Sequence, residues 1–286
     1  MRKLSLIISL CTLLLSGCFG NEPNDTAYIA ALGVDMAQNG NYDITIQFAR
    51  PKQISGGSSE EGGKGGEGIV ENISIEAPDV YSALNIANHI VSKKFSLAHA
   101  KLVVFSSEMA KNGVRDIIES LGRSDEIRPD LICAVSRETA REYLENAQPL
   151  VELNPAKYYQ LIYEENESGG VPKKTGLEVI FEITGDHRDT VMPLSGVAKA
   201  TKEGKQKSEG ESQSDSSSQS QEKPQSEAPV NTEGFQYKTR NYKAGEVKLL
   251  QKDKSEVLGM AVFKGDRLVA ELGETEADIY NILNGD

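Results

Sequence analysis

A long polar stretch, from Thr201 to Glu233, divides this chain of 286 residues into two parts that can fold. It consists almost wholly of Lys, Glu, Gln, Ser, Gly and Pro, and Val230 is its only large aliphatic residue. Because such a segment cannot bury enough apolar area to offset its ordering entropy, we expect a disordered linker or surface insert there. A second stretch, 55–68, is rich in Gly, Ser and Glu and predicts a flexible loop. The core must therefore come from 27–200 and 234–286.

Strand-like and helix-like patterns alternate through 27–200. Apolar and polar residues alternate from Tyr42 to Ala49, which predicts a half-buried strand, and Asn39-Gly40 predicts a hairpin turn joining it to a strand at 27–35. Apolar runs predict further strands at 69–75, 102–105, 131–135 and 194–199. Helical spacing predicts helices at 80–91, at 107–121 with a break at Asn112-Gly113, and at 138–146, 155–165 and 175–183. The first of these is expected to be amphipathic, with a buried stripe formed by Val80, Ala83, Leu84, Ala87, Ile90 and Val91. This order favours a mixed sheet covered by helices, in an α/β or α+β domain.

The residues after the polar stretch predict a second, smaller unit. The patterns indicate that structure resumes at 235–237, followed by a hairpin formed by 257–263 and 268–272 and a helix at 274–283. We therefore expect an α+β fold with mixed sheets covered by helices, in which 234–286 forms a second, partial α+β domain.

The amino terminus carries an export signal. Arg2-Lys3 precedes an apolar run, Leu4 to Leu15, that is shorter than the roughly 20 residues needed to span a bilayer. The tetrad Leu15-Ser16-Gly17-Cys18 then matches the lipobox of bacterial lipoprotein signals. The match implies a signal peptide at 1–17, a diacylglyceryl group on Cys18, and a tether at 18–26. An ordinary secretory leader or an uncleaved short anchor is the alternative.

The net charge of −12 limits which partners can bind by electrostatic attraction. Binding to nucleic acid requires clustered Lys and Arg that displace counterions from phosphates, and no segment of the sequence supplies such a patch. We therefore expect no nucleic-acid partner. The same acidity disfavours adhesion to anionic lipids, so attachment to a bilayer requires the lipid on Cys18.

No group of residues in the sequence calls for catalysis. His89, His99 and His187 are far apart and lack the spacing of metal ligands. Cys133 lies in an apolar run and is expected to pack in the core, and Ser195 lacks the preceding Gly-x of a nucleophile elbow. We therefore expect no enzyme activity, no catalytic residues, no metal and no cofactor.

Several motifs resemble the Ger(x)C family, the lipoprotein C subunits of spore nutrient germination receptors. The main one is the run from Phe95 to Ala110, FSLAHAKLVVFSSEMA. The others, in the family's order, are Leu32-Gly33-Val34-Asp35, Asp125-Glu126-Ile127-Arg128, Ala140 with Leu144, and Ala261 to Val269 followed by Glu274-Thr275. Together with the lipobox, these motifs cover essentially the whole chain.

The resemblance implies a membrane-anchored lipoprotein on the outer face of the spore inner membrane. Its partners would be the membrane-embedded A and B subunits of the receptor, together with the bilayer that holds the acylated Cys18. The chain would support receptor assembly and germination signalling without catalysis. The family's third, carboxy-terminal domain has no counterpart here, so we expect a fragment or a shortened relative. The alternative is a solute-binding envelope lipoprotein, which should show two lobes around a cleft.

Overall fold

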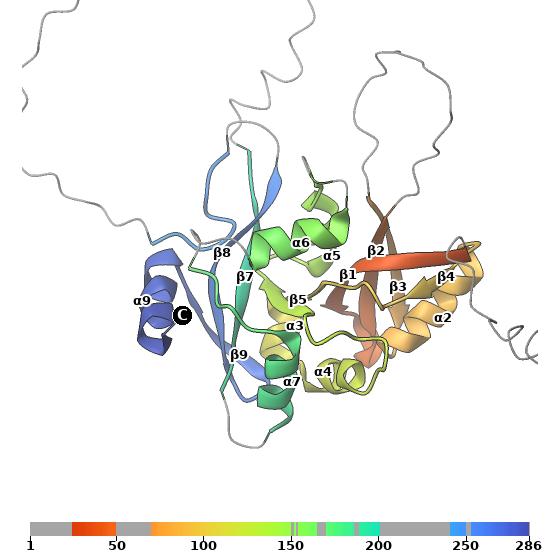
Figure 1. Ribbon diagram of the computed structural model, residues 1–286, viewed down its shortest axis with the longest axis horizontal. Helices are drawn as coiled ribbons and strands as arrows, with labels where there is room; N and C mark the ends of the chain where they lie inside the picture. The colour runs from red at the N-terminus through yellow and green to blue at the C-terminus, as the bar shows by residue number, and fades with distance from the viewer. Residues whose placement is uncertain are drawn as a thin grey trace, which may run out of the picture.

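The computed structural model describes residues 25–49, 70–149, 152, 154–164, 170–185, 189–200, 241–249 and 253–285 (Figure 1). Its strands are β1 (Thr26–Met36), β2 (Tyr42–Ala49), β3 (Val70–Ala77), β4 (Lys94–Ser96), β5 (Leu102–Ser106), β6 (Ile132–Ser136), β7 (Val191–Ala198), β8 (Lys254–Lys264) and β9 (Arg267–Leu272). Its α-helices are α2 (Val80–Ile90), α3 (Ser107–Asn112), α4 (Arg115–Gly122), α5 (Ala140–Asn146), α6 (Pro155–Tyr163), α7 (Gly176–Thr184) and α9 (Glu274–Asn284), and a short 3₁₀ helix spans Gln38–Gly40.

All of these strands belong to one mixed sheet. The order is β3-β2-β1-β5-β6-β7-β8-β9, and β4 pairs with β1 off this path. The four central strands, β1, β5, β6 and β7, are parallel, and helices connect β5 to β6 and β6 to β7, whereas β2 and β3 on one side and β8 and β9 on the other are antiparallel. The predicted α+β class, a mixed sheet covered by helices, is confirmed.

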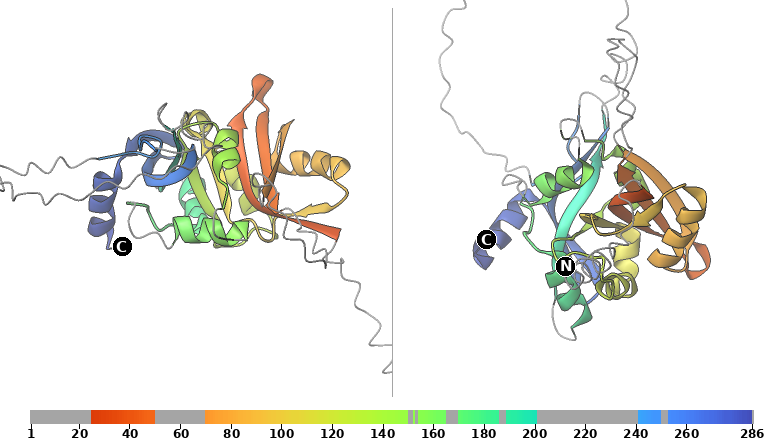
Figure 2. Two further views of the ribbon diagram at one scale, coloured as in Figure 1. Left: turned by 90° about the horizontal axis from the view of Figure 1, so that it is seen from above. Right: turned by 45° about the vertical axis from the view of Figure 1, so that its right-hand side comes forward.

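Helices cover both faces of the parallel strands, which explains why those strands are buried on both sides. On one face, a large apolar cluster joins the sheet to α2, α3, α4 and α7. On the other face, a second cluster joins the sheet to α5 and α6 through Tyr143, Leu144, Tyr159 and Tyr163. Helix α9 packs on β8 at the far end of the sheet from α2 (Figures 1 and 2).

Local sequence signals set several of the helix boundaries. Asp79 caps α2, since its side chain accepts a 2.9 Å hydrogen bond from the N–H of Ser82. Ser106 caps α3 by accepting from the N–H of Met109. Gly113, with φ of 124°, ends α3 and separates it from α4, so the predicted break at Asn112-Gly113 is confirmed.

Two predictions about exposure are wrong. Strand β2 is buried on both faces, because α5 covers the face predicted to be solvated and leaves Thr45 and Gln47 fully buried. Ile90, predicted to lie on the buried stripe of α2, is 65% exposed, because it lies with Ile86 on the outer face of the helix. The buried stripe is formed instead by Val80, Ala83, Leu84 and Ala87.

The two parts of the chain meet in the sheet. Strand β8 pairs antiparallel with β7 from Val191 to Ala198, so the hairpin of 254–272 extends the sheet formed by the first part. The predicted loop at 55–68, the insert at 201–233 and the expected start of structure at 235–237 lie outside the described residues.

Candidate functional site

The residues singled out in the sequence do not come together in the structure. Cys18 and His187 lie outside the described residues. Cys133 lies in β6 with 1% of its surface exposed, and burial raises the pKa of its thiol to about 12, so its role is packing. The ring of His99 meets that of Tyr28 edge to face at 4.6 Å, and His89 lies in the last turn of α2. No group of three or more metal-ligating side chains occurs among the residues that the structure describes.

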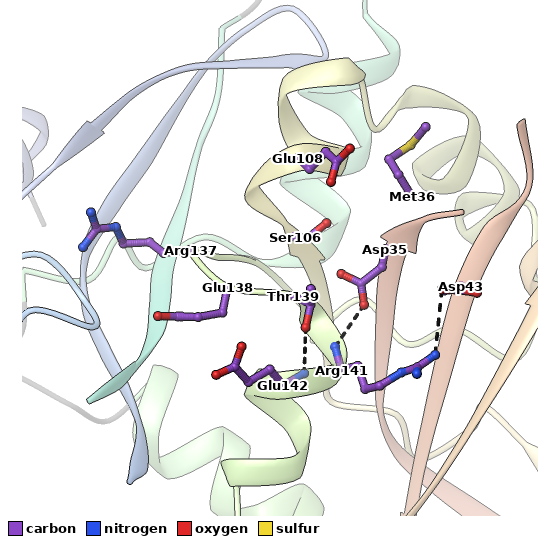
Figure 3. Close-up of a pocket in the computed structure, with 10 residues that line it drawn as sticks. All are labelled: Asp35, Met36, Asp43, Ser106, Glu108, Arg137, Glu138, Thr139, Arg141 and Glu142. Carbon is purple, nitrogen blue, oxygen red and sulfur yellow. Dashed lines mark hydrogen bonds and ion pairs between the residues drawn. The ribbon is translucent and has the colours of Figure 1, made fainter. Parts of the chain in front are cut away.

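A hollow of about 550 Å³ opens where the parallel strands β1, β5 and β6 end (Figure 3). The carboxyl ends of parallel strands are where α/β sheets commonly bind ligands. This hollow is lined by Asp35, Met36, Asp43, Ser106, Glu108, Arg137, Glu138, Thr139, Arg141 and Glu142. Seven of these ten side chains are charged, whereas small-molecule sites are mostly apolar.

Asp35 forms the floor of the hollow and holds the start of α5. Its carboxylate accepts a 2.7 Å hydrogen bond from the N–H of Ala140. It also accepts a 3.0 Å hydrogen bond from the N–H of Arg141 (Figure 3). Burial raises the pKa of Asp35, while these two N–H groups and the Ser106 hydroxyl act against that rise. The two N–H groups would otherwise have no partner in the helix, so this buried carboxylate connects β1 to α5.

Arg137, at one side of the hollow, connects the end of β6 to the second part of the chain, and the neighbouring Glu138 connects it to β7. The Arg137 guanidinium donates to the carbonyl of Ala244 at 3.0 Å and pairs with Glu246 at 3.1 Å and with Glu271 at 3.2 Å. Glu138 accepts a 3.0 Å hydrogen bond from the N–H of Val197 in β7. These charges therefore hold segments together that are distant in sequence.

Gly33 allows α5 to lie directly against β1. A Cβ placed on Gly33 would lie 3.0 Å from Cδ1 of Leu144 and 3.1 Å from Cβ of Ala140. The family-like residues Gly33 and Asp35 in β1, and Ala140 and Leu144 in α5, therefore form one contact. The sequence showed each motif but gave no sign that they meet.

The two remaining family-like motifs of the first part also meet each other. Glu126 accepts a 2.8 Å hydrogen bond from the N–H of Leu97. Lys101 pairs with Asp130, which also forms an ion pair with Arg128 at 3.2 Å. The run that precedes β5 is thus fixed to the loop that precedes β6, and these charged residues have a structural role.

Substitution of Gly33 by valine is expected to lower the free energy of unfolding by about 2 kcal/mol, because the added methyl groups force α5 away from β1. Urea denaturation followed by circular dichroism would measure this change. Gly33→Ala, which adds only Cβ, should cost less. A valine variant as stable as the original protein would show that α5 does not lie this close to β1.

The fold and these contacts define an α+β protein in which the family-like motifs hold one helix-covered sheet together. Residues 20–197 match the family model described as the spore germination protein N-terminal domain. This match spans more than half of the chain and confirms the family indicated by the motifs. The chain belongs to this family of spore germination proteins.

Curated relatives agree with this assignment. The chain is 28% identical over 194 residues to spore germination protein KC of Bacillus subtilis (strain 168), covering 66% of this chain and 47% of that protein. It is 26% identical over 207 residues to the putative spore germination protein YfkR of the same organism, covering 72% and 52%. Spore germination protein GerQC of Bacillus cereus is 22% identical over 162 residues, covering 56% and 44%. The chain thus spans about half the length of these relatives. No solved structure matches significantly.

Proposed function

We propose that this chain is a membrane-tethered, non-catalytic subunit of a spore nutrient germinant receptor. The match of residues 20–197 to the germination family carries the proposal. The contacts around the hollow support a non-catalytic role. The charged groups of Asp35, Arg137 and Glu138 form hydrogen bonds that hold elements of the fold together. Such a protein would act through its surfaces, by supporting receptor assembly and passing on the germination signal.

The proposed partners are the membrane-embedded A and B subunits and the lipid bilayer of the spore inner membrane, on its outer face. The lipobox ending at Cys18 supports this location. No helix in the described part of the chain is long and apolar enough to cross a bilayer. Two acyl chains on Cys18 would hold the protein stably at the surface, whereas a single chain would hold it only marginally.

Cys18→Ala is expected to abolish lipidation and release the protein from membranes. The measurement is detergent-phase partition of tagged original and variant proteins from spores, followed by mass spectrometry of Cys18 in the original protein.

The same tag tests the assembly, since polytopic receptor subunits should co-purify with the original protein from detergent-solubilised membranes. Cys133→Ala is the control, because this thiol is buried in the core and should not affect attachment to the membrane. Unchanged membrane retention of Cys18→Ala would refute the anchor, and absence of polytopic partners would refute the receptor assignment.

A further inference from the structure

The outer face of α2 carries three large apolar side chains and no Asp, Glu, Lys or Arg, although the chain as a whole is strongly acidic; the polar Asn85 and His89 are exposed beside them. Tyr81, Ile86 and Ile90 are 39%, 42% and 65% exposed on this helix. From Val80 to Ser92 the sequence has no Asp, Glu, Lys or Arg, and Lys93-Lys94 follows directly. An exposed helix face with large apolar residues, a tyrosine near one end and lysines after the other is typical of helices that lie in a lipid interface.

The fold fixes this helix beside the start of β1. Lys94 in β4 pairs in parallel register with Thr26, the first residue of β1. The last turn of α2 is joined to β4, because the side chain of Asn88 accepts a 2.8 Å hydrogen bond from the N–H of Phe95. Figures 1 and 2 show α2, β4 and β1 together at one end of the molecule, opposite α9.

The length of chain before β1 limits how far this end can lie from the membrane. Residues 19–25, seven in all, separate Cys18 from Thr26. A fully extended chain over this span reaches about 28 Å at ~3.5 Å per residue. A flexible chain of that length has an average end-to-end distance of about 15 Å. An anchor on Cys18 therefore keeps the carboxyl end of α2 within a few helix diameters of the bilayer.

We propose that the outer face of α2 rests on the lipid bilayer, with Ile86 and Ile90 at the boundary between headgroups and acyl chains. This inference rests on the proposed anchoring through Cys18, which raises the effective concentration of the face at the membrane, so that a weak contact suffices. The acidic remainder of the protein is repelled by anionic lipids, which favours this orientation over others. The acidic group nearest on the helix, Asp79, is engaged with Ser82 at the opposite end.

Single tryptophans can test this contact, because the chain contains no tryptophan of its own. Ile90→Trp places the probe on α2, and Ile282→Trp is the matched control on α9, where the original isoleucine is 74% exposed. Each full-length variant would be extracted from membranes and reconstituted into vesicles of phosphatidylcholine and phosphatidylglycerol, with and without brominated acyl chains. Flotation would establish separately that each protein is bound.

The expected result is a blue-shifted emission for the tryptophan at 90 and severalfold stronger quenching by brominated lipid than for the tryptophan at 282. If the Ile90→Trp protein floats but its tryptophan is not quenched, the contact between α2 and lipid is overturned while the anchor stands. The outer face of α2 would then be assigned to binding a protein partner. Equal quenching of both probes, or stronger quenching at 282, would also overturn it. Failure of both proteins to float would reject the anchor and this contact with it.

Discussion

Replacing Asp35 with alanine is expected to lower the free energy of unfolding by about 3 kcal/mol, because two backbone N–H groups then lose their acceptor. Asp35 is only 7% exposed, so water cannot freely replace the lost carboxylate. For a chain of this size, such a loss lowers the thermal midpoint by roughly 6–12 °C. Differential scanning calorimetry would measure the midpoint, and urea titration would measure the free energy.

Asp79→Ala is the matched control for this variant. Asp79 also accepts from a backbone N–H at a helix start, that of Ser82, but it caps its own helix and is less deeply buried. Loss of an ordinary cap costs about 1 kcal/mol. If Asp35→Ala and Asp79→Ala cost the same, then Asp35 acts as a simple cap, and its proposed role in connecting β1 to α5 is wrong.

The two aspartates should also differ in how their contributions depend on pH. Burial raises the pKa of Asp35. Between the usual Asp value of about 3.9 and this raised value, the folded protein binds more protons than the unfolded chain, so stability falls as pH rises. The stability difference between the original protein and Asp35→Asn should therefore shrink as pH rises through that interval. Hydrogen bonds from Ser82 lower the pKa of Asp79, so the corresponding difference for Asp79→Asn should grow with pH.

Much of the fold could be predicted because its signals are local. The hairpin of β1 and β2 follows from the Asn39-Gly40 turn and the alternation after it. The break between α3 and α4 follows from Asn112-Gly113, since Gly113 adopts a positive φ there. Neighbouring residues specify such features, and the sequence displays those residues side by side.

The contacts that fix the sheet and the hollow could not be predicted, because they join residues far apart in the sequence. Asp35 meets Ala140 across 105 positions, and Arg137 meets Ala244 across 107. Strands β7 and β8 lie on either side of the polar insert in the sequence, and the change in composition there suggested two separate units. In the structure the two strands pair within one sheet. The resemblance to the family gave the motifs their order, but only the structure shows which of them touch.

The polar side of β2 is the clearest case of a local pattern overridden by packing. Alternation predicted that Thr45 and Gln47 face solvent, yet both are fully buried beneath α5. Each has a partner there: Thr45 bonds to Ser74 at 2.8 Å, and Gln47 donates to the carbonyl of Leu144 at 2.9 Å and accepts from the hydroxyl of Tyr159. A polar strand face can be interior when every polar group on it is hydrogen-bonded.

Gln47→Leu is therefore expected to lower the free energy of unfolding by about 3 kcal/mol, because the Tyr159 hydroxyl, fully buried, loses its acceptor. Urea titration would measure this loss. A surface glutamine replaced by leucine would change stability by no more than about 0.5 kcal/mol.

The double variant Gln47→Leu/Tyr159→Phe separates a broken hydrogen bond from a poor fit of leucine. Removing both partners of a buried hydrogen bond is nearly neutral when the shapes are kept, so Tyr159→Phe should recover part of the stability that Gln47→Leu loses. If the two losses add instead, the bond between Gln47 and Tyr159 contributes nothing. In that case the loss in Gln47→Leu comes from the fit of leucine and from the unpaired carbonyl of Leu144.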